Sequence, residues 1–508
     1  MTAPPATSDA PRDASPGSTR GERFGWLASL VLHGAVLGVL AGWTLPDLPH
    51  VLGPLLIAEP AEDETPEAPL LAEEPLTLDP NVSQPVAALT EVAPDAAAPA
   101  PPRDEPAPPT SFALSPATLV APTPNGADEL GLVGVAGRGD AARGALLKAK
   151  GGTQASEMAV GRALRWLTAH QNSDGSWSLD HTGGECRGRC ANPSSMADPA
   201  EVRRETLRCG TALALLPFLG AGETHERGRH RLSVRRGIDA LVKLAEPNRE
   251  GPGADWSDRG QLYSHGLAAI ALCEAFNMSR DERLRAPAQA AIDFIGYAQD
   301  PTGGGWRYRP RQPGDTSVTG WQVMALKSAS LADLRTPRSS ATLTRRFLDA
   351  AAESGGARYR YRPADPLEET SPPPLSATRP LTAVALLCRM YLGWEADDPR
   401  LIAGAEWVAE QGPSPTDYYF NYYAAQTLFH YTGGEGPVWR KWNEALRDQL
   451  VEQQSRRGHE RGSWWIDDNH NRRGGRLYTT SLATMTLEVY YRYLPLYQSA
   501  AVQAEFPE

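Results

Sequence analysis

Cysteine is scarce in this sequence, which has five in a chain of 508 residues. Cys209, Cys273 and Cys388 each lie inside an apolar stretch that is long enough for a helix. Isolated thiols in such stretches are typically small buried side chains. We therefore predict no chemical role for these three residues.

The other two cysteines, Cys186 and Cys190, share the Gly- and Arg-rich loop HTGGECRGRC. If this loop lies in an oxidising compartment, a local disulfide between them is predicted. A metal site that also uses His181 is the alternative, although the spacing matches a zinc pattern weakly. The prediction from sequence is a disulfide, with no metal ion and no cofactor.

Basic runs are also missing, which argues against a nucleic-acid partner. The net charge of -11 is unevenly spread. Between Pro46 and Gly137 there are about 15 acidic residues and a single base, Arg103, so this segment carries the acidic excess of the whole chain. The low isoelectric point describes a linker rather than a binding surface.

Long apolar runs are absent apart from residues 24–45, which read FGWLASLVLHGAVLGVLAGWTL. A run of about 20 apolar residues is long enough to span a bilayer as a helix. Trp26 and Trp43 stand where interfacial aromatic residues are expected, and Arg20 and Arg23 precede the run, which predicts a cytoplasmic N-terminus. A cleaved signal peptide is the alternative, but its apolar region is normally shorter and no clean cleavage site follows.

This assignment divides the first part of the chain. Residues 1–23 are predicted to be a cytoplasmic tail, 24–45 a transmembrane helix and 46–150 a disordered linker. The linker is rich in Pro, Ala and Glu, so it cannot bury enough apolar surface to fold and should form an extended tether. Everything beyond residue 45 is then extracytoplasmic, or periplasmic in a bacterium.

From residue 151 to 498 an internal repeat of about 50 residues predicts an all-α ring, followed by a short tail, 499–508. One half of each unit is an amphipathic helix that ends in a Gly-aromatic turn, as at Trp177, Trp306 and Trp464. The other half is a smaller apolar helix with Ala-Leu or Thr-Leu near its centre. Six such pairs predict an (α/α)6 toroid, with an open superhelical solenoid as the alternative.

The turns contain a recognisable motif. Gln171-x3-Gly175-x-Trp177 is a Q-x-G-x-W repeat, and it recurs at Gln299 with Trp306 and, less perfectly, at Gln454 with Trp464. With the repeated helices, this resembles the squalene–hopene cyclase and protein prenyltransferase superfamily, and in particular bacterial membrane-anchored squalene cyclase-like repeat proteins. The resemblance implies an α/α toroid in which Gln caps one helix and Trp packs on the next.

The residues that would make this chain a cyclase are missing. Cyclases of this superfamily protonate an alkene with an Asp-x-Asp-Asp-Thr motif, and the nearest match here is Gly314-Asp315-Thr316. Asp315 is therefore either a helix N-cap or a lone catalytic acid. A prenyltransferase zinc set from Cys209, His265 and Asp315 lacks the ligand spacing of the family. The thioester sequence of complement-type toroids is absent as well.

Aligning the inner helices on their central dipeptide brings six polar residues to one level. They are Arg208, His265, Thr319, Arg379, Asn421 and Thr480, and Tyr263 lies beside His265. Such a layer near helix N-termini would favour an anionic or polyhydroxylated ligand at the mouth of the ring. The alternative is that first-turn residues are polar because they border solvent.

Two functions therefore remain open. The first is a non-catalytic binding or scaffold toroid that is tethered to the membrane and presents a polar mouth. The second is an enzyme that acts on an isoprenoid or a glycan, with Asp315 and His265 as its acid–base pair.

Overall fold

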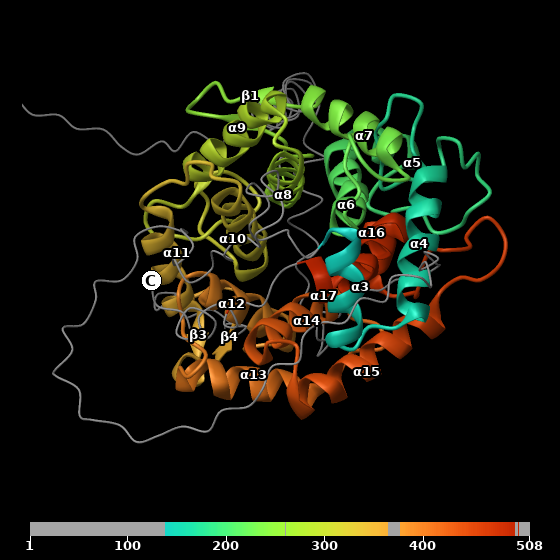
Figure 1. Cartoon of the computed structure of the whole chain (residues 1–508). Coiled ribbons are helices and arrows are strands. Elements are labelled where there is room, and N and C mark those ends of the chain that lie inside the picture. The colour runs from blue at the N-terminus through green and yellow to red at the C-terminus, as the bar shows by residue number, and fades with distance from the viewer. Residues whose placement is uncertain (1–137, 260, 364–375, 493–495, 497–508) are drawn as a thin grey trace, which may run out of the picture. The chain divides into compact units, whose positions relative to one another are not determined.

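The computed structural model describes residues 138–259, 261–363, 376–492 and 496 (Figure 1). None of the helices in these residues is long and apolar enough to cross a membrane. The predicted transmembrane segment 24–45 and the predicted linker up to residue 137 lie outside the described part of the chain.

The described residues form two concentric layers of helices, and consecutive helices alternate between the layers (Figure 1). The inner helices are α6 (Leu207–Gly220), α8 (Leu262–Ser279), α10 (Thr316–Leu331), α12 (Arg379–Tyr391), α14 (Tyr418–Thr432) and α16 (Asn469–Leu487). The outer helices are α4 (Gln154–Ala169), α7 (Arg231–Lys243), α9 (Glu282–Ala298), α11 (Ser340–Ala351), α13 (Pro399–Gln411) and α15 (Gly436–Gln453).

The inner layer is a closed ring. Each inner helix packs against the next one along the chain, and the last, α16, packs against the first, α6 (Figure 1). The outer layer also spans this junction, because α15 and α16 both contact α4. The predicted α/α toroid is confirmed, and the open solenoid is excluded for the described residues.

The inner helices are buried on all sides, which their composition explains. In α8 and α10 nearly every residue is inaccessible to solvent, as expected of helices with apolar side chains on every face. Glycine allows neighbouring inner helices to approach closely: a Cβ on Gly320 would lie 2.4 Å from the side chain of Val384 in α12. Carboxylate N-caps at Asp315 and Asp417 fix where α10 and α14 begin.

The Gly-aromatic turns connect the two layers as the motif predicts. The indole N–H groups of Trp177 and Trp306 donate to backbone carbonyls at the end of the preceding outer helix, at 2.8 Å in both turns. Gln171 donates to the carbonyl of Gly175 at 2.8 Å and so closes the turn. Gly175 has a φ of +94°, and a Cβ there would meet the carbonyl oxygen of Arg236 in the next outer helix. The motif is therefore a structural joint between consecutive repeats.

The remaining elements are short. They are α3 (Asp140–Ala149), α5 (Pro199–Glu205), the 3-10 helix η3 (Ser354–Gly356), α17 (Val489–Arg492) and the two-residue strands β1 (Glu246–Pro247), β2 (Ala254–Asp255), β3 (Ala352–Glu353) and β4 (Arg358–Tyr359). β1 pairs with β2 and β3 with β4, each antiparallel. These small hairpins lie between an outer helix and the following inner helix.

Helix α3 differs from the prediction, which assigned it to the linker. It packs against α17, and Arg138 just before it enters a buried ion cluster. The Glu274 carboxylate of α8 accepts from Arg138 at 2.8 Å and from Arg492 at 3.1 Å. The folded domain therefore begins before residue 151, because these arginines bring both ends of the described chain to the same inner helix.

Candidate functional site

The N-terminal ends of the inner helices form the mouth of the ring, and partly exposed tyrosines line it. We call Tyr263, Tyr308, Tyr361, Tyr419 and Tyr478 the mouth tyrosines. Tyr263, Tyr419 and Tyr478 come from the first turns of α8 and α14 and from α16, and all five are partly exposed. The Tyr419 hydroxyl reaches the Ser317 carbonyl of α10 at 3.5 Å, although α12 stands between these helices in the ring. The mouth tyrosines therefore extend across the opening.

Asp315 lies beneath these tyrosines and is fully buried. One of its oxygens accepts from the Val318 backbone N–H at 2.8 Å, as an N-cap does. The other accepts from the Tyr361 hydroxyl at 3.2 Å, and Tyr361 is in turn 2.8 Å from the Tyr308 hydroxyl. A chain of hydroxyl groups therefore connects the buried carboxylate to the mouth.

Burial controls the ionisation of this group. Loss of hydration raises the pKa of Asp315 to about 6, and the Val318 N–H and the Tyr361 hydroxyl oppose that rise. Burial also raises the pKa of Tyr263, with the nearby Asp315 as the next cause. The Tyr263 phenol therefore remains protonated at neutral pH and can both donate and accept hydrogen bonds.

Aromatic side chains occupy the axis below the mouth. Trp321 of α10 stacks on Tyr422 of α14, with ring centroids 5.7 Å apart, and meets Tyr423 edge-on at 5.5 Å. All three are at most 2% exposed. Because α10 and α14 are separated by α12 in the ring, these contacts cross the interior. These aromatic residues therefore fill the interior of the ring between α10 and α14.

The predicted polar layer has a structural function. In each of five turns a backbone N–H donates to a polar side chain on the following inner helix, at distances between 2.8 and 3.1 Å. These pairs are Trp177 with Thr211, Trp256 with His265, Trp306 with Thr319, Tyr359 with Thr382, and Ser414 with Asn421.

Three of the six predicted residues, His265, Thr319 and Asn421, are therefore joints between layers. In α16 the corresponding bond is made by Thr479, which donates to the Trp464 carbonyl at 2.8 Å. The predicted residue Thr480 is fully buried and donates to a carbonyl of its own helix at 2.6 Å. The four predicted residues in this group, which exclude Thr479, therefore do not form a ligand layer at the mouth.

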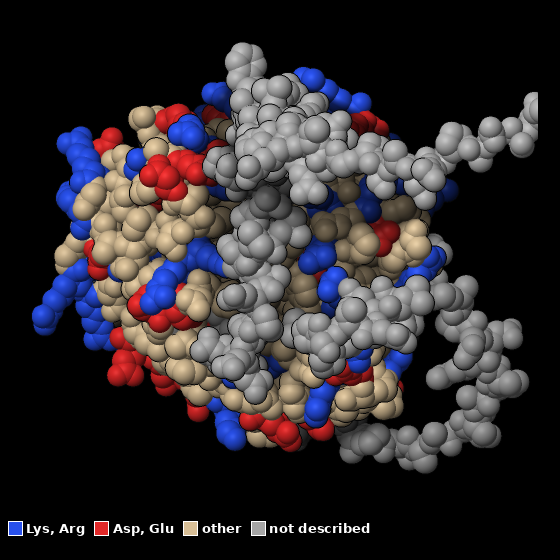
Figure 2. Space-filling view, turned by 180° about the vertical axis from the view of Figure 1, so that it is seen from behind, with Lys and Arg blue, Asp and Glu red and all other residues tan. Residues whose placement is uncertain are grey.

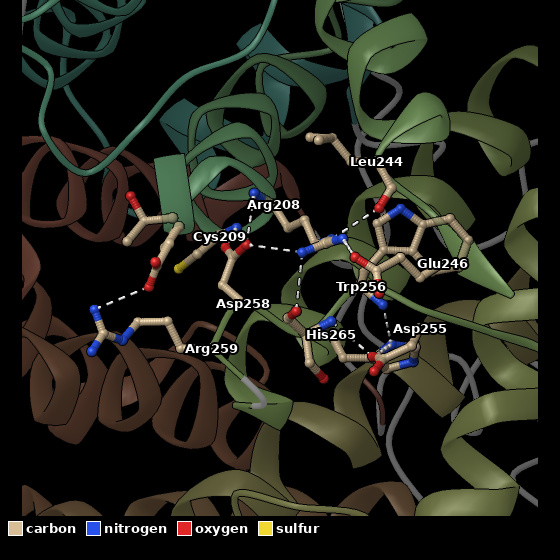
Figure 3. Close-up of polar contacts among 12 residues, drawn as sticks. Arg208, Cys209, Leu244, Glu246, Asp255, Trp256, Asp258, Arg259 and His265 are labelled. Carbon is tan, nitrogen blue, oxygen red and sulfur yellow. Dashed lines mark hydrogen bonds and ion pairs between the residues drawn. The ribbon is translucent and has the colours of Figure 1, made fainter. Parts of the chain in front are cut away.

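His265 is fully buried and uses both ring nitrogens, which argues against the predicted base (Figure 3). Its Nδ1 accepts from the Trp256 backbone N–H at 3.1 Å, and its Nε2 lies 3.0 Å from the Ala291 carbonyl of α9. An Nδ1 that accepts from Trp256 leaves Nε2 to donate to the Ala291 carbonyl, and the same Nδ1 lies 3.5 Å from the Asp255 carboxylate. The side chain joins α8 to the outer layer and cannot pair with Asp315 as an acid–base couple.

The two predicted arginines also have structural partners. Arg208 donates to the Leu244 carbonyl at 2.8 Å and forms an ion pair with Glu246 (Figure 3). Arg379 donates to the Ser414 hydroxyl at 3.2 Å and lies over the Phe420 ring. Acidic and basic side chains are interspersed over the face of the molecule that Figure 2 shows. These features do not favour an anionic ligand.

Several solved structures share a similar arrangement of helices. An inactive variant of an α-1,6-mannanase from Salegentibacter sp., in complex with α-1,6-mannotriose, gives a TM-score of 0.46 at 8% identity over 65% of this chain and 98% of that one. A glycoside hydrolase family 76 mannosidase from Bacteroides thetaiotaomicron gives 0.44 at 11% identity, covering 68% and 99%. The type II terpene cyclase MstE from Scytonema, as a variant with its product, gives 0.41 at 14%, covering 68% and 98%.

At these TM-scores and identities the similarity says nothing about the chemistry of this chain. No protein-family model and no curated protein matches the sequence.

Two mouth tyrosines, Tyr308 and Tyr361, were not singled out from sequence. Each lies two residues after the aromatic residue of its turn, in Trp306-Arg307-Tyr308 and in Tyr359-Arg360-Tyr361. Because the aromatic residue is buried and the chain is extended there, the residue two positions on reaches the mouth. The repeated aromatic-Arg-Tyr pattern could have identified both.

The predicted disulfide is not formed, since Cys186 and Cys190 are both free thiols. The histidines whose ring nitrogens lie close to their sulfur atoms are His170 and His459. His181, the predicted alternative ligand, instead lies next to the His170 ring, with centroids 5.6 Å apart.

Proposed function

We propose that this chain is a non-catalytic toroid whose mouth binds a neutral polyhydroxylated ligand, such as a glycan. The observation that carries this proposal is the mouth itself, where partly exposed tyrosines lie above an axis filled by Trp321, Tyr422 and Tyr423. Tyrosine combines an apolar face with a hydroxyl that donates and accepts, which suits the mixed surface of a sugar. A hydrocarbon would need a deep apolar cavity instead.

The same proposal includes the membrane anchor. Residues 24–45 would hold the N-terminus in the bilayer, and the acidic linker would let the toroid reach a ligand outside the cytoplasm. Cell fractionation of the full chain and of a variant that lacks residues 24–45 tests this part. The full chain should sediment with membranes and its toroid should be cleaved by protease added to spheroplasts, while the variant should not sediment.

Ligand binding is tested on the full chain in detergent micelles with three probes. These are dextran and mannan as neutral polysaccharides and heparin as an anionic one. We expect at least one neutral polysaccharide to retard the chain in affinity electrophoresis, and Tyr419→Ala to weaken that binding at least tenfold. Tyr431→Ala is the matched control, because Tyr431 is partly exposed at the opposite end of the same helix. Binding to heparin alone would contradict the proposal.

A second candidate function is supported by Asp315. A buried carboxyl with a pKa of about 6, connected to the mouth through Tyr361, has the properties of a general acid. In this case the chain would be an enzyme acting on an isoprenoid or a glycan. Incubation with squalene and with the same polysaccharides between pH 5 and 8 should then give a product, and Asp315→Asn should abolish it without weakening binding.

A further inference from the structure

We propose that His170, Cys186, Cys190 and His459 form a structural Zn²⁺ site that joins the first repeat of the toroid to the last. The four ligand atoms all lie within 4.8 Å of one another. The cysteines and His170 are buried, and His459 is partly exposed. None of the four ligands is a mouth tyrosine, and this proposal does not depend on the function proposed for the mouth.

The distances match tetrahedral coordination. The Cys190 Sγ is 3.3 Å from His170 Nε2 and 3.2 Å from His459 Nδ1, and the Cys186 Sγ is 3.7 Å from His459 Nδ1. A tetrahedron with Zn–S bonds of about 2.3 Å and Zn–N bonds of about 2.0–2.1 Å has ligand-to-ligand edges of roughly 3.3 to 3.8 Å. The side chains are therefore already spaced for a metal ion between them.

His170 has the orientation expected of a metal ligand. It caps the end of α4, and its Nδ1 lies 2.6 Å from the Trp166 carbonyl, to which it donates. The ring is held further by stacking on Trp166, with centroids 3.9 Å apart. With the proton on Nδ1, the lone pair of Nε2 points at the cluster, and zinc-binding histidines are commonly held in this way by a backbone carbonyl on the other ring nitrogen.

The two cysteines lie on one tight turn. Of the three residues between them, Arg187 and Gly188 have positive φ values, 52° and 71°. This conformation brings the Cys190 backbone N–H to 3.3 Å from the Cys186 Sγ. The N–H group can therefore stabilise a thiolate, and both sulfur atoms face the same point.

The ligand set identifies the metal. Two thiolates and two imidazoles in a tetrahedron suit Zn²⁺ better than Mg²⁺ or Ca²⁺, which take oxygen ligands. Because the protein supplies all four ligands, no position is left for water or a substrate. The site is therefore structural rather than catalytic.

The position of the site explains its purpose. His170 ends the first outer helix, the cysteines lie in the insertion that follows, and His459 is in the turn between α15 and α16. Cys190 and His459 are 269 residues apart in sequence. A metal ion here would link the two repeats where the ring closes, as a disulfide would, by restricting the unfolded chain.

Metal analysis of the full chain tests this proposal. The chain is purified in detergent without a polyhistidine tag or chelator, and its zinc content is measured by mass spectrometry of the elements. We expect about one zinc per chain, and visible d–d and thiolate charge-transfer bands of tetrahedral Co²⁺ after exchange. Removal of the metal by a chelator should lower the Tm by about 5 °C or more.

Variants locate the site. Cys190→Ser and His459→Ala should each lose the zinc, and His459→Ala should still fold because its side chain is partly exposed on a loop. Cys388→Ala and His470→Ala are the matched controls, since one is a buried thiol and the other an exposed histidine outside the cluster. A chain without zinc whose Cys186 and Cys190 react freely with thiol reagents would overturn the proposal, and so would a Cys186–Cys190 disulfide in the native protein.

Discussion

The Tyr361 hydroxyl donates to the buried carboxylate of Asp315, which also caps α10. This pair fixes the start of an inner helix and involves a carboxyl whose pKa burial raises to about 6. Asn retains the capping function of Asp but cannot ionise. Asp315→Asn therefore separates the two roles.

The first prediction concerns the pH dependence of stability. Because the folded pKa of Asp315, about 6, lies above the ordinary value of 3.8, its contribution to stability is full below pH 3.8 and is lost as the pH rises through 6. Relative to the native chain, Asp315→Asn should therefore become more stable by roughly 2–3 kcal/mol as the pH rises from 4 to 8. Urea unfolding at several pH values measures this gain, and parallel pH profiles would contradict it.

The second prediction concerns the turn glycine of the last repeat. Gly462 has a φ of +94°, and a Cβ there would lie 2.5 Å from the Arg162 carbonyl of α4. Gly462→Ala should lower the free energy of unfolding by about 3 kcal/mol or more, since neither backbone can yield. Gly355→Ala is the control, because Gly355 has a φ of +67° but no atom near its Cβ position. It should lose about 1–2 kcal/mol in the same denaturation assay, and equal losses would rule out the close contact as the cause.

A third prediction concerns the aromatic residues that fill the axis. Trp321→Ala removes the ring that stacks on Tyr422 and should cost about 3–5 kcal/mol of stability by leaving a cavity. Because that cavity would be apolar, indole added at millimolar concentration should raise the Tm of the variant and leave that of the native chain unchanged. If indole does not raise the Tm of the variant, the surrounding side chains have collapsed into the cavity.

The fourth prediction concerns the buried ion cluster. Glu274→Gln removes the charge that Arg138 and Arg492 share and should lower the free energy of unfolding by about 3–5 kcal/mol. Glu282→Gln, at an exposed ion pair with Arg285 on α9, should change little. If the two variants were equally stable, the cluster would contribute no more than a surface pair.

The architecture could be predicted from sequence because its signals are local and repeated. Each Q-x-G-x-W turn needs a left-handed glycine and an aromatic residue at fixed spacing, as at Gly175 and Trp177. Several imperfect copies of one pattern identify a repeat even when one copy is degenerate. Closure of the ring followed from the number of copies.

The polar layer was predicted less accurately than the fold, because the sequence pattern of an inner helix does not distinguish one helical turn from the next. Alignment on the central dipeptide chose Arg208 and Arg379, whereas the residues that bond to the turns are Thr211 and Thr382. Each pair is three residues apart and therefore lies on the same helix face. His459 was missed for another reason, since only the closed ring brings it to His170.

Closure of the ring has a consequence for how the domain opens. A linear repeat array can fray from its ends, because an end repeat has one neighbour. Here α16 packs on α6, so every inner helix has two neighbours and there is no end repeat to release first. Opening must break two interfaces at once, and the toroid should unfold in a single cooperative step rather than peel away repeat by repeat.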